Sequence, residues 1–119
     1  MEITALERIQ KEINVDAKEI NKLVTVIIPT LNEVEGIGLV LNELIGVGVS
    51  RDRVLVVDGG STDGTVRVAE ERGVRVIRQL GRGGKADAIK TALRYVETPY
   101  MLVMDGDYTY PRHGNPPTY

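Results

Sequence analysis

Four short apolar runs recur along the chain, and each one ends at polar or glycine-rich residues. The strands that they predict are Leu23–Ile28, Arg53–Val57, Val74–Ile77 and Met101–Met104. Nearly continuous runs of Val, Ile and Leu over this length are typical of strands buried on both faces of a parallel sheet. The pattern therefore predicts an α/β fold whose core is a mostly parallel sheet of about four strands.

The segments between these strands have the spacing of amphipathic helices. They run from Asn32 to about Ile45, from Thr62 or Asp63 to Gly73, and from Lys85 to about Val96. Crossover helices between parallel strands are right-handed and cover both faces of the sheet. We therefore expect a three-layer α/β/α, Rossmann-like arrangement. The strand order 3-2-1-4 would make the first and fourth strands neighbours and open a crevice between them.

The two ends of the chain differ from this central pattern. The segment from Ile3 to Asn21 has the apolar spacing of an amphipathic helix, and Asp16 could cap a second helical piece. The last residues contain prolines and a glycine without periodicity, which indicates irregular chain. We therefore expect an N-terminal helical segment over residues 1–22, one α/β domain over 23–111 and an irregular tail over 112–119.

Composition excludes several classes of function. The formal net charge of −2 provides no basic surface for nucleic acid, and the chain has no cysteine for a disulfide or a thiolate metal site. The N-terminal residues lack the pattern of a signal peptide, and no apolar run approaches the ~20 residues that cross a bilayer. These features predict a cytoplasmic protein without nucleic-acid partners.

Three predicted strands end in polar clusters, which are Pro29–Glu33, Asp58–Thr65 and Asp105–Asp107. Parallel strands bring their carboxyl ends to one edge of the sheet, so the clusters should face the same crevice. We expect Thr30, Asn32 and Glu33 to project polar groups into it. Each cluster alone also fits a strand exit with a helix cap, or a surface turn.

The second and third clusters offer different chemistry. Glycines beside Asp58 would let a ligand approach the backbone, and the Asp58 carboxylate can accept hydrogen bonds from a base or a ribose. Asp105 and Asp107 flank a single glycine, and their oxygens suit a hard divalent cation, which in turn suits a diphosphate. Together they predict a nucleotide and metal site.

The segment Gly84–Ala88 places a cation at a helix start. Lys85 and the helix N-terminus both favour a nearby anion, although for this segment alone a solvated loop charge is the slightly favoured interpretation. The segment is not a Walker loop, because Gln79 stands where the first glycine would be and Ala86 replaces the Mg-binding hydroxyl residue.

Four ordered motifs carry a resemblance to a known family. They are Val26–Glu33, Val56–Thr65, Gly84–Ala88 and Met104–Pro111. Together they resemble the family 2 glycosyltransferases with a GT-A fold, and among them most closely the dolichol-phosphate mannose or glucose synthases and related polyprenyl-phosphate sugar transferases. The resemblance covers roughly Leu23 to Pro111, and it implies that residues 23–111 are the nucleotide-sugar-binding part of such an enzyme.

The resemblance also implies roles for single residues. Pro29, Leu31 and Glu33 would border the nucleotide. Asp58 would contact the base, and we also expect Lys85 to be among the residues that bind the nucleotide sugar. Carboxylates at the fourth strand complete the site.

In that implied site, Asp105 lies by the ribose, the diphosphate and the metal, and Asp107 binds Mg²⁺ or Mn²⁺. Gly59 stands where the family often has a second Asp, which we expect to shift the base contacts. Thr109 replaces a Gln or similar residue, which we expect to remove one metal ligand. No residue of this chain is assigned a catalytic role.

The expected function is the donor half of a metal-dependent, inverting glycosyltransferase that uses a UDP- or GDP-linked sugar and a polyprenyl or dolichyl phosphate acceptor. Such an acceptor extends the expected location to the cytoplasmic face of a membrane. Family members continue beyond the fourth strand, so we expect a C-terminally truncated chain that forms homo-oligomers to cover exposed apolar surface. The alternative is a non-catalytic nucleotide-binding fragment, or a subunit that another chain completes.

Overall fold

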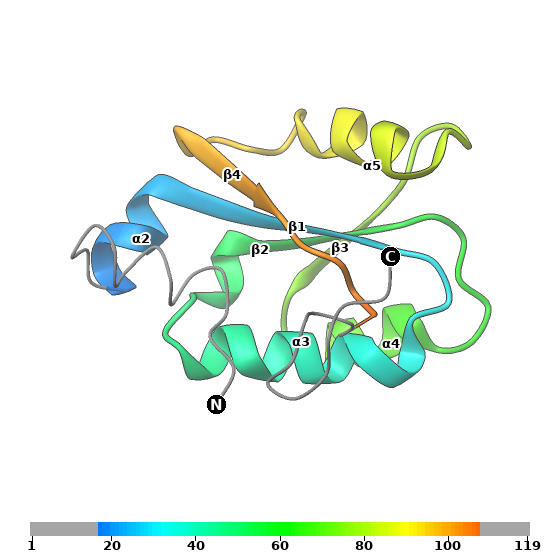
Figure 1. Ribbon diagram of the computed structural model, residues 1–119, viewed down its shortest axis with the longest axis horizontal. Helices are drawn as coiled ribbons and strands as arrows, with labels where there is room; N and C mark the ends of the chain where they lie inside the picture. The colour runs from blue at the N-terminus through cyan, green and yellow to red at the C-terminus, as the bar shows by residue number, and fades with distance from the viewer. Residues whose placement is uncertain (1–16, 108–119) are drawn as a thin grey trace, which may run out of the picture.

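A computed structural model describes residues 17–107 and shows a sheet between two layers of helices (Figure 1). The elements are α2 (Ala17–Leu23), β1 (Val24–Thr30), α3 (Val34–Gly46), a 3₁₀ turn (Arg51–Arg53), β2 (Val54–Asp58), α4 (Thr65–Glu71), β3 (Arg75–Arg78), α5 (Gly84–Ala92) and β4 (Tyr100–Val103). The predicted helical residues 3–16 and the predicted tail 112–119 lie outside the described residues.

The four strands form one parallel sheet in the order β3-β2-β1-β4. Ile28 is level with Val56 of β2, and Val26 is level with Leu102 of β4. Because β1 lies between β2 and β4, the direction of winding reverses there, which is where open α/β sheets form a ligand crevice. The predicted fold class is confirmed, and the strands have the order for which we expect a crevice between the first and fourth strands.

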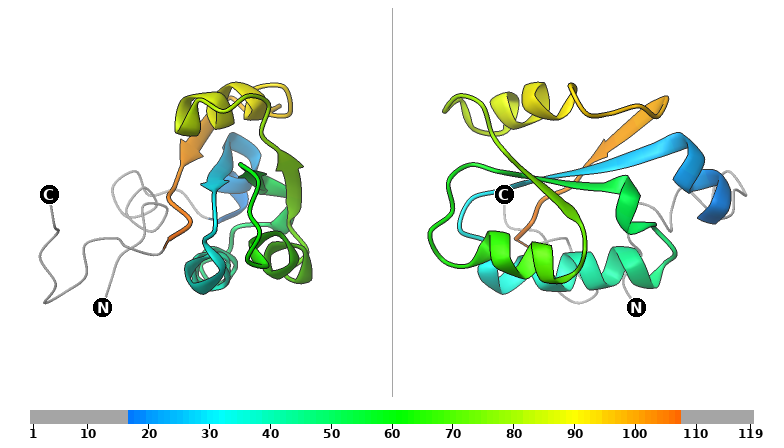
Figure 2. Two further views of the ribbon diagram at one scale, coloured as in Figure 1. Left: turned by 90° about the vertical axis from the view of Figure 1, so that its right-hand side faces the viewer. Right: turned by 180° about the vertical axis from the view of Figure 1, so that it is seen from behind.

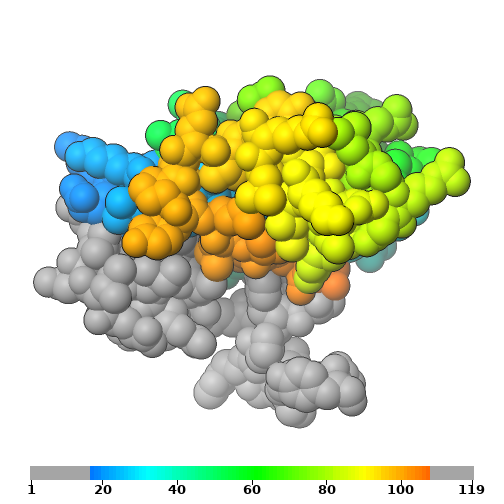
Figure 3. All heavy atoms as spheres, turned by 90° about the horizontal axis from the view of Figure 1, so that it is seen from above, coloured from blue at the N-terminus to red at the C-terminus, as the bar shows by residue number. Residues whose placement is uncertain are grey.

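Alternation along the strands builds two cores of unequal size. Val26 and Ile28 of β1 face α3 and α4 and pack with a large cluster of buried side chains, whereas Ile27 faces α5 and packs with Ala88 and Ala92. Figures 1 and 2 show α3 and α4 together on one side of the sheet and α5 alone on the other. Figure 3 shows the face that carries α5, with β4 beside it. The three-layer prediction is therefore confirmed.

The predicted end of the first strand at Ile28 is wrong, because β1 continues to Thr30 and Pro29 is level with Val57. Proline lacks an N–H, so it fits a strand only where no acceptor needs one. The carbonyl of Ile27 accepts from Met104 on the β4 side, and the carbonyl of Thr30 accepts from Gly59 on the β2 side. By alternation Pro29 faces the β4 side, where β4 has already ended.

Two helices are shorter than predicted. The helix α4 begins at Thr65, because Gly64 has a φ of 98° and cannot continue a right-handed helix toward Asp63. The helix α5 ends at Ala92, because the next turn tightens: the Tyr95 N–H donates to the Ala92 carbonyl, three residues back.

The strand β4 was predicted to be buried, but Met101 to Val103 are half-buried and Tyr100 is exposed. The reason is its position, since within the described sheet β4 pairs with β1 alone. Leu23, predicted as the first strand residue, instead closes α2. Over residues 17–107, none of the helices is both long and apolar enough to cross a bilayer.

Candidate functional site

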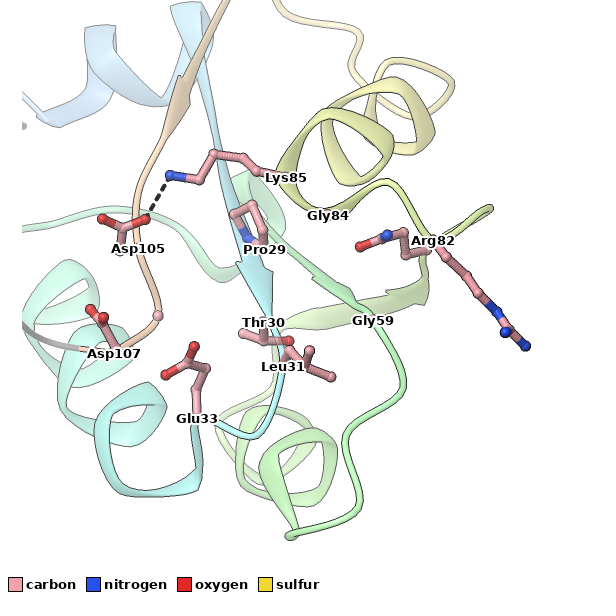
Figure 4. A pocket seen from close by; sticks show the side chains of 12 residues that line it. Pro29, Thr30, Leu31, Glu33, Gly59, Arg82, Gly84, Lys85, Asp105 and Asp107 are labelled. Atoms are coloured by element: carbon pink, nitrogen blue, oxygen red, sulfur yellow. Dashed lines mark hydrogen bonds and ion pairs between the residues drawn. The ribbon is translucent and has the colours of Figure 1, made fainter.

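The carboxyl ends of the strands surround a pocket of about 580 Å³. Among the described residues, 17–107, those that line it are Pro29, Thr30, Leu31, Glu33, Gly59, Gln79, Arg82, Gly84, Lys85, Asp105, Gly106 and Asp107. Six of the seven residues predicted to bind a nucleotide sugar or a metal therefore lie in one cavity, and Asp58 is the exception. Figure 4 shows that they come from the end of β1, the start of α5 and the segment after β4.

One wall of the pocket is acidic. Glu33 precedes α3, and its carboxylate lies near those of Asp105 and Asp107 in Figure 4. Burial raises the pKa of Glu33 above its ordinary value, and the negative charges of Asp107 and Asp105 raise it further. Concentrated negative charge of this kind is relieved by a cation, and oxygen donors suit Mg²⁺ or Mn²⁺. The side chains present therefore fit a divalent metal.

The described residues contain no group of three or more His, Cys, Asp or Glu side chains arranged to hold a metal ion. The carboxylates of Asp105 and Asp107 would need additional oxygen ligands to complete a coordination shell. A diphosphate or water can supply them. The geometry therefore fits a metal that binds together with a phosphorylated ligand better than a permanent protein-only metal site.

A lysine bridges the pocket toward this acidic wall. The Nζ of Lys85, near the start of α5, lies 2.9 Å from Oδ1 of Asp105 (Figure 4). Both side chains are 57% exposed, so water screens the pair and its net stabilisation is small. An exposed lysine of this kind can exchange one anionic partner for another.

Two glycines position the segment that carries the acidic side chains. Gly106 is buried, and a Cβ there would lie 3.0 Å from Cγ2 of Thr30. A Cβ on Gly36 of α3 would lie 2.6 Å from the backbone carbonyl carbon of Asp107. A Cβ on Gly36 would collide with backbone, and a Cβ on Gly106 would press on the side chain of Thr30. Backbone packing against β1 and α3 therefore places Asp105 and Asp107.

Asp58 has a different environment from the one predicted. Its Oδ1 accepts hydrogen bonds from the hydroxyls of Thr30 and Ser61, and its Oδ2 accepts from the N–H groups of Gly60 and Ser61. Burial works against ionisation, yet these hydrogen bonds hold the pKa of Asp58 below its ordinary value. The carboxylate does not line the pocket, so a contact between Asp58 and a base stays a prediction.

Asn32 also serves the loop after β2. It adopts a φ of 53°, and its Oδ1 accepts from the N–H of Thr62 at 2.9 Å. The expectation that its side chain projects into the crevice is wrong, because the backbone donors of the loop draw it away. Thr30 does line the pocket, but its hydroxyl donates to Asp58.

Sequence reasoning did not select Gln79 and Arg82 as binding residues, whereas it expected a ligand to approach the glycines beside Asp58, and one of these, Gly59, lines the pocket. A signal for Gln79 was available: it directly follows β3, and the same rule that selected the other strand ends applies to it. Arg82 lies in the loop before α5, and in Figure 4 its side chain extends away from the acidic wall.

The sequence profile described as glycosyl transferase family 2 matches residues 25–115. The glycosyltransferase AglJ of Haloferax volcanii is 43% identical over 88 residues, which are 73% of this chain and 28% of AglJ. The dolichyl-phosphate hexose transferase of the same organism is 36% identical over 86 residues, covering 72% of this chain and 37% of that protein.

Solved structures show the same architecture. Glucosyl-3-phosphoglycerate synthase of Mycobacterium tuberculosis, in complex with Mn²⁺, UDP-glucose and phosphoglyceric acid, has a TM-score of 0.62 and 28% identity, covering 76% of this chain and 35% of the synthase. The same enzyme has also been solved with Mg²⁺ and UDP.

The chain thus spans about a third of the length of these relatives. The profile match nevertheless extends over most of this chain, and the parallel sheet agrees with it. The chain belongs to glycosyl transferase family 2.

Proposed function

We propose that this chain forms the part of a glycosyltransferase that binds a nucleoside-diphosphate sugar, UDP- or GDP-linked, together with Mg²⁺ or Mn²⁺. The observation that carries the proposal is the single pocket in which Glu33, Asp105 and Asp107 face Lys85. Such a pocket offers carboxylates to a cation and an ammonium group to phosphate oxygens. The complexes of the mycobacterial synthase with Mn²⁺ and UDP-glucose support this choice of ligand.

Asp105 and Asp107 would hold the divalent cation, which supplies charge neutralisation for the departing nucleoside diphosphate. Lys85 would leave Asp105 and bind a phosphate oxygen, because a doubly charged diphosphate attracts it more strongly than one exposed carboxylate does. Pro29 and Leu31 would border the nucleoside, where β1 ends and the backbone N–H of Pro29 is absent.

For the complete enzyme we propose sugar transfer with inversion to a lipid phosphate. The dolichyl-phosphate hexose transferase among the relatives supports a polyprenyl phosphate acceptor. An acceptor phosphate is already anionic, so it needs little help from a general base. Work on a lipid acceptor would place the enzyme at the cytoplasmic face of a membrane, and self-association through the half-buried β4 edge stays a prediction.

Calorimetry of the 119-residue chain with UDP-glucose and GDP-mannose tests the proposal. We expect binding of at least one sugar nucleotide with Mn²⁺ and a loss of that binding when EDTA removes the metal. A second arm measures sugar transfer to a short polyprenyl phosphate. Donor binding without transfer would indicate a donor-binding module, whereas an absence of binding by every nucleotide sugar with either metal would contradict the proposal.

A further inference from the structure

The pocket has a second end that carries no carboxylate. In Figure 4 the end of β1, with Pro29 to Leu31, lies between the acidic side chains and Gly59. Leu31 is 57% exposed, although it is a large apolar side chain. A glycine without a side chain beside an exposed leucine offers apolar surface that suits an aromatic ring, and Arg82 lines the same side of the pocket.

Gln79 adds the hydrogen-bonding group at this end. Its N–H donates to the Asp58 carbonyl at 2.8 Å, and the N–H of Gly59 donates to the Thr30 carbonyl at 2.8 Å, so the ends of three strands lie side by side. The position that a Cβ would take on Gly59 is 3.4 Å from Oε1 of Gln79 and 3.9 Å from Cδ1 of Leu31. The space over Gly59 is therefore bounded by an amide and an aliphatic group.

One hydrogen bond holds the side-chain amide of Gln79 in place and leaves part of its hydrogen-bonding capacity for a ligand. Nε2 of Gln79 donates to the Gly81 carbonyl at 3.2 Å, which leaves this NH₂ group a second N–H. The hydroxyl of Thr30 already donates to Asp58, and the other polar side chains lining the pocket are charged. Within residues 17–107, Gln79 is thus the lining side chain that offers a neutral donor and a neutral acceptor together.

We propose that Gln79 determines which nucleobase this pocket accepts, with the base lying over Gly59 and against Leu31. The inference rests on the proposed function, because it needs a nucleoside diphosphate whose phosphates occupy the acidic end. The edges of nucleobases differ in their order of donors and acceptors, and an amide can match one order and leave another unpaired.

Binding by the 119-residue chain is measured with UDP, GDP, ADP and CDP, each with Mn²⁺, and with inorganic pyrophosphate and Mn²⁺ as the ligand without a base. The variants are Gln79→Ala and Gln79→Glu. The control is Asn42→Ala, an exposed amide on α3 whose Oδ1 accepts from Arg72 and which does not line the pocket.

We expect the wild type to prefer one nucleotide. Gln79→Ala should lower the affinity for that nucleotide by about 3–10-fold, which corresponds to the loss of one hydrogen bond. Pyrophosphate affinity should be unchanged, and the control should keep the wild-type preference. Gln79→Glu keeps the size of the side chain but loses its donor, so it should change the order of the four nucleotides.

The inference would be overturned if the wild type bound all four nucleotides equally, or if the Gln79→Ala variant kept the wild-type preference. It would also be overturned if Gln79→Ala lowered the affinity for pyrophosphate as much as the affinity for the preferred nucleotide, because Gln79 would then only support the structure of its loop. If the wild type binds neither pyrophosphate nor any nucleotide with Mn²⁺, the proposed function fails together with this inference.

Discussion

Two acidic strand ends of this molecule look alike in sequence and differ in structure. Asp58 and Asp105 both follow apolar strand residues and both precede a glycine. The carboxylate of Asp58 is buried and accepts four hydrogen bonds from Thr30, Gly60 and Ser61. The carboxylate of Asp105 is 57% exposed, faces the pocket and lies within reach of a lysine.

The difference shows what makes a carboxylate available for chemistry. Both sit at carboxyl ends of parallel strands, so position in the fold does not separate them. The hydrogen-bond donors of the loop that follows each strand distinguish the two carboxylates. The loop after β2 directs N–H and hydroxyl groups toward Asp58, whereas the segment after β4 is held by backbone packing. Asp58 therefore supports the loop, whereas Asp105 and Asp107 line the pocket.

The largest effect should come from Asp58→Asn, because an amide has one acceptor oxygen where the carboxylate has two, so its NH₂ group would face either the two N–H groups or the two hydroxyls that now donate to Asp58. We expect the free energy of unfolding in urea to fall by about 2–4 kcal/mol. The native pKa lies below 3.8, so the difference from wild type should persist above pH 3.8 and vanish as pH falls through the native pKa. Exposed Asp52→Asn serves as the control, and equal stability of the two variants would refute the structural role.

Gly36→Ala tests how the segment after β4 is held. A methyl group would overlap the backbone of Asp107, and overpacking of this kind costs about 1–3 kcal/mol. Affinity for Mn²⁺ should fall too, because Asp107 must move. Gly46→Ala, in the same helix with open space around it, should be neutral or stabilising. Thermal unfolding and Mn²⁺ titration of both variants provide the comparison; similar results for the two would show that the close contact is unimportant.

Asp107→Asn should affect metal binding and leave stability almost unchanged, whereas Asp58→Asn should lower stability. The residue is exposed, so we expect stability to change by less than about 0.5 kcal/mol. Removal of a ligand charge should weaken Mn²⁺ binding in the presence of a nucleotide by about tenfold or more. Urea unfolding and calorimetry measure the two effects. A large loss of stability with unchanged metal binding would mean that Asp107 stabilises the fold and does not bind the metal.

Lys85→Ala should have effects of opposite sign on two ligands. Without its ion pair, Asp105 becomes more available to a cation, so Mn²⁺ alone should bind up to about fivefold more tightly, the range for an exposed pair. A nucleoside diphosphate should bind more weakly, because a phosphate contact is lost. Lys90→Ala on the same helix controls for net charge. A change in the same direction for both ligands would argue against partner exchange.

The smallest effect should follow Glu33→Gln. The raised pKa of Glu33 means that the ionised side chain opposes folding, so wild-type stability should fall as pH rises from 4.5 through the native pKa. The Gln variant should be more stable than wild type at neutral pH by no more than about 0.5 kcal/mol, and the advantage should disappear below pH 4.5. Urea unfolding at pH 4 and pH 7 measures it.

Much of the fold follows from pattern alone. Apolar runs and helical spacing predicted the four strands and the three layers, and burial on both faces explains the runs of β1 and β2. Element ends were less predictable. The start of α4 depends on the positive φ of Gly64, and the length of β1 depends on where β4 ends beside Pro29, which only the assembled sheet determines.

The site divides in the same way. Pro29, Leu31, Glu33, Lys85, Asp105 and Asp107 could be grouped from sequence, since each lies at a strand end or a helix start at one edge of the sheet. The burial of Asp58 could not, because one of its donors, Thr30, lies 28 residues away in the chain. Asn32 turned toward Thr62 for the same reason, through a partner brought by folding.

The close packing of Gly36 and Gly106 against their neighbours has one more consequence. The backbone that carries Asp105 and Asp107 packs closely between β1 and α3 before any ligand binds. A cation entering such a preorganised site loses little entropy to ordering the protein, so more of its attraction remains as affinity. The absence of a side chain at Gly36 and Gly106 thus fixes where the two carboxylates place negative charge in the pocket.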